Sequence, residues 1–186
     1  MLLFIIGYMG CGKTTFGKAL SAATGLRFID LDHYIVDRCQ ASVPEIFAKH
    51  GEDGFRKIER EMLLEVCNLQ DTIVSCGGGT PCFFDNIDIM NAHGVTMWLQ
   101  ASHECLFSRL IRKREKRPLL AGKTDEQISE IIVDQLAKRT PFYSKAQHTW
   151  QGDSLEDRRQ IDDNIADFLK NWSLPLSRDV NHHDES

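Results

Sequence analysis

The stretch Gly7-Tyr8-Met9-Gly10-Cys11-Gly12-Lys13-Thr14 fits the pattern GxxxxGK[ST] and decides the fold. It follows the apolar run Leu2–Ile6 and opens the amphipathic stretch Lys13–Thr24, which is the strand-to-helix context that this pattern requires. Glycines let the backbone turn so that its N–H groups, together with the helix N-terminus, form a cradle for anions. The loop therefore predicts a nucleoside triphosphate site. A glycine-rich turn that merely begins a helix is the alternative.

Different side chains of this loop are expected to bind different parts of a nucleotide and its metal ion. Lys13 is placed to reach the β- and γ-phosphates, and the Thr14 hydroxyl is placed to bind Mg²⁺. The predicted ATP-binding residues of the loop are Gly10, Cys11, Gly12, Lys13, Thr14 and Thr15. Two interpretations of Cys11 stay open: a thiol open to modification, or a small side chain that the loop tolerates, which we favour.

Short apolar runs alternate with longer amphipathic stretches along the rest of the chain. Strands are predicted at Leu2–Ile6, Arg27–Asp30, Thr72–Cys76, Val95–Leu99 and, weakly, His148–Gln151. Helices are predicted at Lys13–Thr24, Leu31–Arg38, Val43–His50, Gly54–Leu69, Asn86–His93, Ser102–Arg112, Thr124–Arg139 and Leu155–Trp172. This alternation predicts an α/β fold of three layers, with a parallel sheet and helices on both faces. We expect one domain over residues 1–172 and a flexible polar tail over 173–186.

Composition excludes several classes of protein. The 186 residues are 42% hydrophobic and 26% charged, as expected of a globular chain rather than a disordered one. No apolar run approaches the roughly 18 residues that a membrane span needs. The net charge of −5 provides no general positive field for nucleic acid. The six cysteines form no CxxC pair, and with no signal peptide we expect a cytoplasmic protein that binds neither nucleic acid nor a membrane.

The carboxylates that accompany the phosphate loop come from the second predicted strand. The GTPase strings DxxG and NKxD are missing from the chain, and the strand Thr72–Cys76 ends in glycines rather than in an aspartate. Asp30 and Asp32 instead stand at the carboxyl end of Arg27–Asp30, the edge of an open α/β sheet where ligands bind. One carboxylate can serve the metal and the other a substrate hydroxyl. The alternative for Asp32 is a helix N-cap.

Four further features have both a functional and an ordinary interpretation. Arg56 and Glu59 share a helix face, which by itself is typical of a solvated ion pair. Gly77, Gly78 and Gly79 allow close approach of backbone to a ligand, or form a flexible loop. Five positive charges within residues 112–118 fit a lid over phosphates, at about residues 111–123, or a solvated face. Arg139 closes a predicted helix before Pro141 and could simply complement the helix C-terminus.

Taken together, these motifs resemble shikimate kinase. The matching elements are Gly7–Thr15, Asp30-Leu31-Asp32, Phe55-Arg56-Lys57-Ile58-Glu59, Gly77-Gly78-Gly79, Arg117-Pro118-Leu119-Leu120 and Arg139-Thr140-Pro141-Phe142-Tyr143, in the family's order over about residues 1–150. The phosphate loop is common to a very large superfamily, whereas the combination is specific. The resemblance implies a nucleoside-monophosphate-kinase-like fold with five parallel strands in the order 2-3-1-4-5 and a lid. It also implies ATP-dependent phosphorylation of the 3-hydroxyl of shikimate, in the pathway to chorismate and the aromatic amino acids.

The resemblance also assigns roles to individual residues. It implies Lys13, Asp32 and Arg117 as catalytic residues, with Arg117 as the lid arginine that also binds ATP. It implies Asp32, Arg56, Gly77, Gly78, Gly79 and Arg139 as shikimate-binding residues, the two arginines gripping the carboxylate in the way that guanidinium forks suit. Thr14 and Asp30 resemble the Mg²⁺ shell. The expected ligands are ATP, Mg²⁺ and shikimate, bound by a monomer.

Parts of the chain depart from the family. Cys11 stands where Ser or Ala is usual, and Cys39-Gln40-Ala41 replaces a stretch that usually holds a glycine. The basic run before Arg117 aligns only with a gap, so whether Arg109 or Arg112 flanks the adenine stays open. Two alternatives remain: a kinase of another small hydroxy acid such as gluconate, and a catalytically silent nucleotide-binding module.

Overall fold

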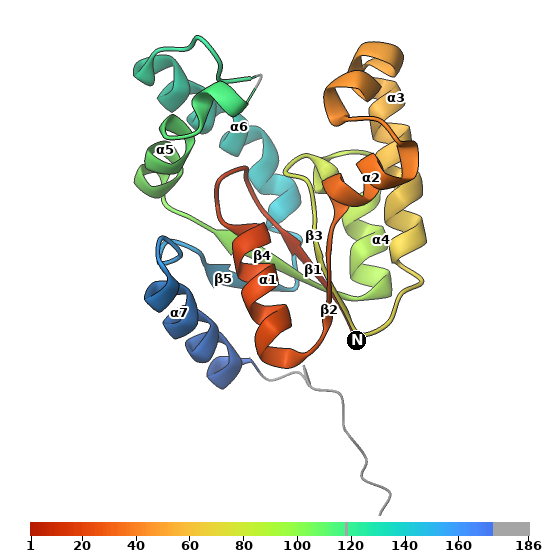
Figure 1. Cartoon of the computed structure of the whole chain (residues 1–186), viewed down its shortest axis with the longest axis vertical. Helices are drawn as coiled ribbons and strands as arrows, with labels where there is room; N and C mark the ends of the chain where they lie inside the picture. The colour runs from red at the N-terminus through yellow and green to blue at the C-terminus, as the bar shows by residue number, and fades with distance from the viewer. Residues whose placement is uncertain (118, 173–186) are drawn as a thin grey trace, which may run out of the picture.

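Five parallel strands form one sheet in the order β2-β3-β1-β4-β5 in the computed structural model, which describes residues 1–117 and 119–172 (Figure 1). The strands are β1 Leu2–Ile6, β2 Arg27–Asp30, β3 Thr72–Ser75, β4 Val95–Gln100 and β5 His148–Gln151. The predicted fold class and strand order are confirmed. The expected tail over 173–186 and Pro118 of the expected lid lie outside the described residues.

Helices cover both faces of this sheet, as predicted. They are α1 Lys13–Thr24, α2 Leu31–Cys39, α3 Val43–Val66, α4 Asn86–His93, α5 His103–Ile111, α6 Asp125–Tyr143 and α7 Arg158–Asn171, with short 3₁₀ turns η1 Thr80–Cys82 and η2 Arg114–Lys116. Helices α1 and α7 pack side by side on one face, while α4 packs on the other (Figure 1). Within the described ranges, no helix combines the length and the apolar character needed to cross a bilayer.

Strand β1 forms the centre of the core and leads directly to the site. All five residues of Leu2–Ile6 are buried, because helices cover both faces of the strand. It pairs with β3 on one side and with β4 on the other, so the chain turns in opposite directions from this point. The carboxyl end of such a strand is the switch point at which open α/β sheets bind ligands. The loop that follows β1, over residues 7–12, therefore opens at that point.

Helix α3 replaces two predicted helices, Val43–His50 and Gly54–Leu69. Its backbone breaks at Gly51, which has φ 66° and ψ −175°, so the two helical segments join at a kink. Glycine adopts this left-handed φ without the steric cost that a Cβ would bring. Ser42 and Glu45 fix the N-terminus through a reciprocal capping box. The kink redirects the second segment, which carries Arg56 and Glu59.

Helix α6 runs past the end that the proline predicts. We expected the helix to close at Arg139, but it continues through Pro141 to Tyr143. A proline this close to a helix end removes only one backbone hydrogen bond, and little helix follows it. The fully buried Tyr143 side chain donates a hydrogen bond of 2.5 Å to the Gly78 carbonyl, which anchors the last turn. Arg139 consequently lies inside the helix and does not terminate it.

Candidate active site

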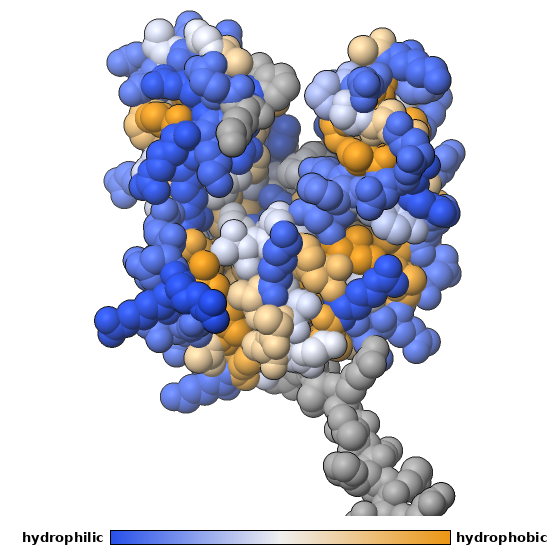
Figure 2. Space-filling view, viewed as in Figure 1, coloured by the Kyte–Doolittle hydropathy of each residue, from blue (hydrophilic) through white to orange (hydrophobic). Residues whose placement is uncertain are grey.

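A cleft of about 640 Å³ opens at the carboxyl edge of the sheet. Figure 2 shows the molecule hollowed between two upper lobes, one carrying α5 and the segment that leads to α6, the other carrying α2 and α3. Among the predicted site residues, the cleft is lined by Gly10, Gly12, Lys13, Thr14, Thr15, Asp30, Asp32, Gly77, Gly78 and Arg117. The fold thus brings residues from the first, second and third strand ends and from the lid segment to one concave surface.

The phosphate loop has the conformation that an anion cradle requires. Gly7, Gly10 and Gly12 all have positive φ, and α1 begins at Lys13 directly after them. The Lys13 ammonium is nearly buried and donates to the carbonyls of Gly7 and Tyr8 at 2.8 and 3.0 Å. Its charge is therefore held at the mouth of the loop, where phosphates would lie. The Cys11 side chain is 1% exposed, which favours its interpretation as a small tolerated residue.

Thr14 and Asp30 lie together on the cleft wall. The Thr14 hydroxyl donates to Asp30 Oδ2 at 2.7 Å, and its oxygen is 3.5 Å from Ser75 Oγ at the end of β3. These are hard oxygen donors of the kind that Mg²⁺ prefers. Asp30, not Asp32, is the N-cap of α2, since its carboxylate accepts from the His33 backbone N–H. The capping alternative for Asp32 is therefore wrong.

Asp32 projects from the first turn of α2 into the cleft. Among the described residues, no hydrogen bond or ion pair engages its carboxylate, so its oxygens are free to accept from a ligand. The residue is exposed to solvent at the cleft, while protein atoms surround its carboxyl group on the other sides. Burial, and then the negative charges of Asp30 and Glu59, raise the pKa of Asp32, while Lys13 and Arg56 partly oppose this shift. A carboxylate with a raised pKa and a free acceptor face suits transfer of a hydroxyl proton.

The three consecutive glycines form a surface on which three functional side chains rest. A Cβ at Gly77 would lie 2.9 Å from Asp32 Oδ1, and one at Gly79 would lie 2.8 Å from Arg56 Nη2. A Cβ at Gly78 would lie 3.3 Å from Arg139 Nη1. Because any side chain at 77 or 79 would displace a charged group, close approach is what requires glycine here. This contradicts the alternative of a merely flexible loop.

Arg56 is held from several sides, and its pairing with Glu59 is not a solvated surface contact. Arg56 Nη1 donates to Glu59 Oε2 at 2.8 Å, and the Glu59 side chain is 1% exposed. Glu59 Oε1 in turn accepts from Thr80 Oγ1 at 2.6 Å. The Arg56 guanidinium carbon lies 4.0 Å from the centre of the Phe83 ring, and Arg56 Nε is buried without a partner in the described residues. A rigid cation with unused donors is thus aimed at the glycine loop.

Arg139 reaches the same loop from the opposite lobe. Its guanidinium lies 5.6 Å from the centre of the Tyr8 ring and close to Gly78. Neither Arg56 nor Arg139 lines the cleft itself. They flank the glycine loop beside it, one from α3 and one from α6. Two guanidinium groups on either side of a backbone loop can grip a carboxylate between them.

The sequence did not assign the residues at the far end of the cleft. Arg109 donates to the carbonyls of Gly10 and Cys11 and pairs with Glu156 at 2.5 Å, and Arg112 pairs with the same Glu156 at 2.8 Å. Arg109, Arg112, Leu155, Glu156 and Ile161 all line the cleft there. The sequence did not indicate that these residues meet, because residues 109 and 156 are far apart along the chain. Both arginines line the cleft beside the phosphate loop.

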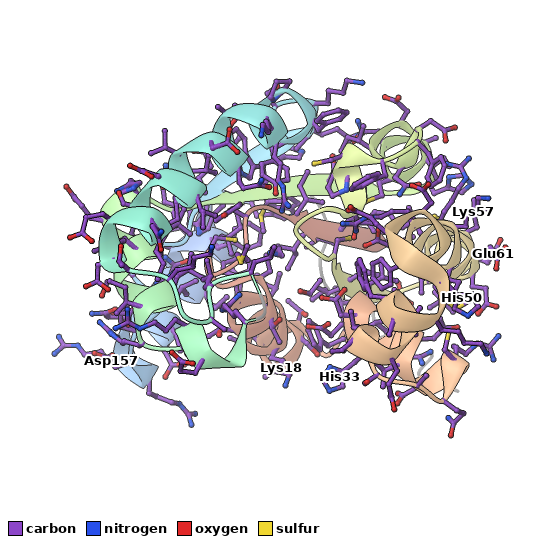
Figure 3. All side chains as sticks on the ribbon, turned by 90° about the horizontal axis from the view of Figure 1, so that it is seen from above. Lys18, His33, His50, Lys57, Glu61 and Asp157 are labelled. Carbon is purple, nitrogen blue, oxygen red and sulfur yellow. The ribbon has the colours of Figure 1, made fainter. Side chains whose placement is uncertain are left out.

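The outer surfaces of the lobes carry the charges that the site does not use. Seen from above, Lys57 and Glu61 project from the outer side of α3, away from the centre of the molecule (Figure 3). They are exposed neighbours of Arg56 and Glu59, which are largely buried. Helix periodicity thus separates a solvated ionic face from the face that builds the site. The neighbouring Lys57 offers a matched control for substitution of Arg56.

Comparison with known proteins identifies relatives of this site. Residues 9–170 match the family model described as shikimate kinase. A relative from Phocaeicola vulgatus, named shikimate kinase, is 50% identical over 168 residues, which cover 90% of this chain and 96% of the relative. The crystal structure of shikimate kinase from Bacteroides thetaiotaomicron aligns with a TM-score of 0.88 at 44% identity, covering 91% of this chain and 97% of that one. The shikimate kinase of Acinetobacter baumannii in complex with shikimate aligns with a TM-score of 0.78 at 29% identity, covering 91% and 90%.

Proposed function

Because this chain belongs to the shikimate kinase family, we propose that its cleft transfers the γ-phosphate of ATP to the 3-hydroxyl of shikimate through the residues described above. The observation that carries this proposal is the free Asp32 carboxylate, which lies between the phosphate loop and a glycine loop flanked by Arg56 and Arg139. This arrangement places an acceptor for a hydroxyl proton between a phosphate site and a carboxylate site.

We assign the substrate carboxylate to Arg56 and Arg139. Their guanidinium groups approach the glycine loop from α3 and α6, and each can form a forked pair with a carboxylate. Backbone groups of Gly77, Gly78 and Gly79 then border the bound ring. The resemblance assigns no role to Glu59. The Glu59 carboxylate accepts hydrogen bonds from Arg56 and Thr80, and we propose that it holds the Arg56 guanidinium in place.

The proposed chemical step uses three charged side chains, Asp32, Lys13 and Arg117. Asp32 accepts the proton of the substrate hydroxyl while the hydroxyl oxygen forms a bond to the γ-phosphorus. The bond from that phosphorus to the bridging oxygen of ADP breaks, and the negative charge moves onto ADP. Lys13 and Arg117 stabilise the charge that spreads over the phosphoryl oxygens, which is the main work of a phosphoryl transferase.

Mg²⁺ fits the donors present beside the phosphate loop. We propose that Thr14 and Asp30 hold it, since both offer hard oxygen atoms at the cleft wall. Within residues 1–117 and 119–172, no group of three or more His, Cys, Asp or Glu side chains could hold a metal ion. Nucleotide phosphates would thus complete the shell, as is usual for Mg²⁺ in kinases. When bound, the ion supplies neutralisation of phosphate charge.

We further propose that residues 1–172 act as one kinase domain in a monomer, with residues 111–123 as its lid and 173–186 as a tail. One chain supplies every residue named above. All six cysteines are free, which supports a reducing cytoplasmic location. ATP and shikimate are the proposed partners, with no nucleic acid or membrane among them.

Release of ADP in a coupled assay, measured with shikimate and separately with gluconate, tests the proposed function. We expect ADP release that depends on shikimate and on Mg²⁺, and a phosphate ester at the 3-hydroxyl detected by ³¹P and ¹H NMR. Release with gluconate alone would favour the other small hydroxy-acid kinase. Nucleotide binding without turnover on either compound would favour the silent module.

A further inference from the structure

Tyr143 joins helix α6 to the glycine loop through a hydrogen bond that the proposed mechanism does not use. Its side chain is fully buried, and its hydroxyl donates to the Gly78 carbonyl at 2.5 Å. The centre of its ring lies 5.7 Å from the centre of the Trp98 ring on β4. The ring is thus packed against the sheet, while the hydroxyl reaches the loop that follows β3.

The Gly78 carbonyl depends on this bond. The carbonyls of its neighbours Gly77 and Gly79 each accept from a backbone N–H of η1, at 3.1 and 2.8 Å. Within residues 1–117 and 119–172, the Gly78 carbonyl accepts a hydrogen bond from Tyr143 alone. A carbonyl that loses its partner in a largely buried segment loses free energy that water does not fully restore. Tyr143 therefore fixes the middle of the glycine loop to α6.

Arg139 lies on the same side of α6. It precedes Tyr143 by four residues, so the two side chains share one face of the helix. A Cβ at Gly78 would lie 3.3 Å from Arg139 Nη1 and 3.3 Å from the Met9 backbone nitrogen. This glycine thus borders both the guanidinium and the backbone of the phosphate loop. Burial raises the pKa of Tyr143, and the charge of Arg139 opposes this shift, in agreement with the contacts.

We propose that Tyr143 is a positioning residue for the substrate: its hydroxyl fixes Gly78 relative to Arg139, so that the glycine loop and this guanidinium meet one carboxylate. In the described part of the chain, no other hydrogen bond joins α6 to residues 77–79. Without this bond, the loop and the last turn of the helix would be free to shift apart. The inference rests on the role proposed above for Arg139.

Tyr143→Phe removes the hydroxyl and keeps the ring. We expect the KM and the calorimetric Kd for shikimate to rise about tenfold, the scale of leaving one buried acceptor unpaired, and kcat to change less than about threefold. The KM for ATP should stay the same, because Lys13 holds the phosphate loop through contacts of its own with the Gly7 and Tyr8 carbonyls. The melting temperature should fall, since a hydrogen bond is lost.

Tyr34→Phe is the matched control for that loss of stability. The Tyr34 hydroxyl donates to Glu65 Oε2 at 2.8 Å, between α2 and α3 and away from the glycine loop. Its removal should also lower the melting temperature, but the KM for shikimate and the KM for ATP should both equal those of the parent. The pair of variants separates positioning of the substrate from stabilisation of the fold.

Two results would overturn the inference. The first is a Tyr143→Phe enzyme that melts at a lower temperature but keeps the parent KM for shikimate, because the hydroxyl would then only stabilise the fold. The second is full additivity of Tyr143→Phe and Arg139→Ala in kcat/KM for shikimate, since a residue that acts through Arg139 has little left to lose once the guanidinium is gone. Arg139→Ala by itself tests the underlying proposal. The parent KM for shikimate in that variant would refute the role of Arg139, whereas a strongly raised KM together with an unaffected Tyr143→Phe would refute only the role of Tyr143.

Discussion

Replacing Asp32 by Asn separates catalysis from structure at this position. The carboxylate forms no hydrogen bond or ion pair within the described part of the chain, and Asp30 rather than Asp32 caps α2. The substitution therefore breaks no protein contact and leaves the cap intact. The amide can still accept a hydrogen bond from a hydroxyl, but it cannot take up its proton. We expect turnover to fall on the order of 10²-fold, the scale of general-base assistance, with a smaller change in shikimate affinity.

The same substitution has a predictable effect on stability. Burial and the neighbouring charges of Asp30 and Glu59 raise the pKa of Asp32 in the folded protein. A carboxyl whose folded pKa is raised contributes stability below its unfolded pKa and loses that contribution as pH rises through its folded pKa. At neutral pH the parent is therefore the less stable protein, and Asp32→Asn should melt at a higher temperature. The difference should shrink as pH falls below the unfolded value.

Three measurements test this reasoning: turnover, shikimate affinity by calorimetry, and melting temperature against pH. The acidic limb of kcat/KM in the parent should have its midpoint above the ordinary value for aspartate, and this limb should be absent in Asp32→Asn. Asp37→Asn, an exposed acid on the same helix, controls for loss of one negative charge. Turnover within about threefold of the parent, against the roughly 10²-fold loss expected, would refute a catalytic Asp32.

Three further outcomes are expected. Lys13→Ala should abolish turnover and weaken ATP binding, because no other side chain of the phosphate loop carries a positive charge; near-normal turnover in a coupled assay would contradict this. Arg56→Ala should weaken shikimate binding by about 2–5 kcal/mol in calorimetry while ATP binding persists, whereas Lys57→Ala, on the outer face, should leave both unchanged. Amide hydrogen exchange over residues 111–123 should be fast in the free protein and slower with nucleotide and shikimate both bound; equal protection would exclude a lid.

The architecture could be predicted closely from local signals. The phosphate loop after an apolar run, and the regular alternation of strands and helices, predicted every strand within one residue of its observed ends. Predictions of helix ends were wrong where tertiary contacts stabilise a helix beyond a residue that usually breaks it. Pro141 was expected to follow the end of its helix, yet burial and anchoring of Tyr143 extend α6 beyond it. Two separate helices, Val43–His50 and Gly54–Leu69, were expected, but they form one helix with a kink at Gly51.

The candidate site also has features that the sequence predicted and features that only tertiary contacts determined. Motif spacing by itself determined the phosphate loop, the acidic pair and the glycine loop, because each is a short segment whose chemistry depends on adjacent residues. Only the tertiary structure decided which aspartate caps α2, that the Arg56–Glu59 pair is buried, and that Arg109 and Arg112 pair with Glu156 at one end of the cleft. These features depend on burial and on contacts between segments that are distant in the sequence. Such contacts form only when the sheet brings its strand ends to one edge, so local sequence patterns cannot predict them.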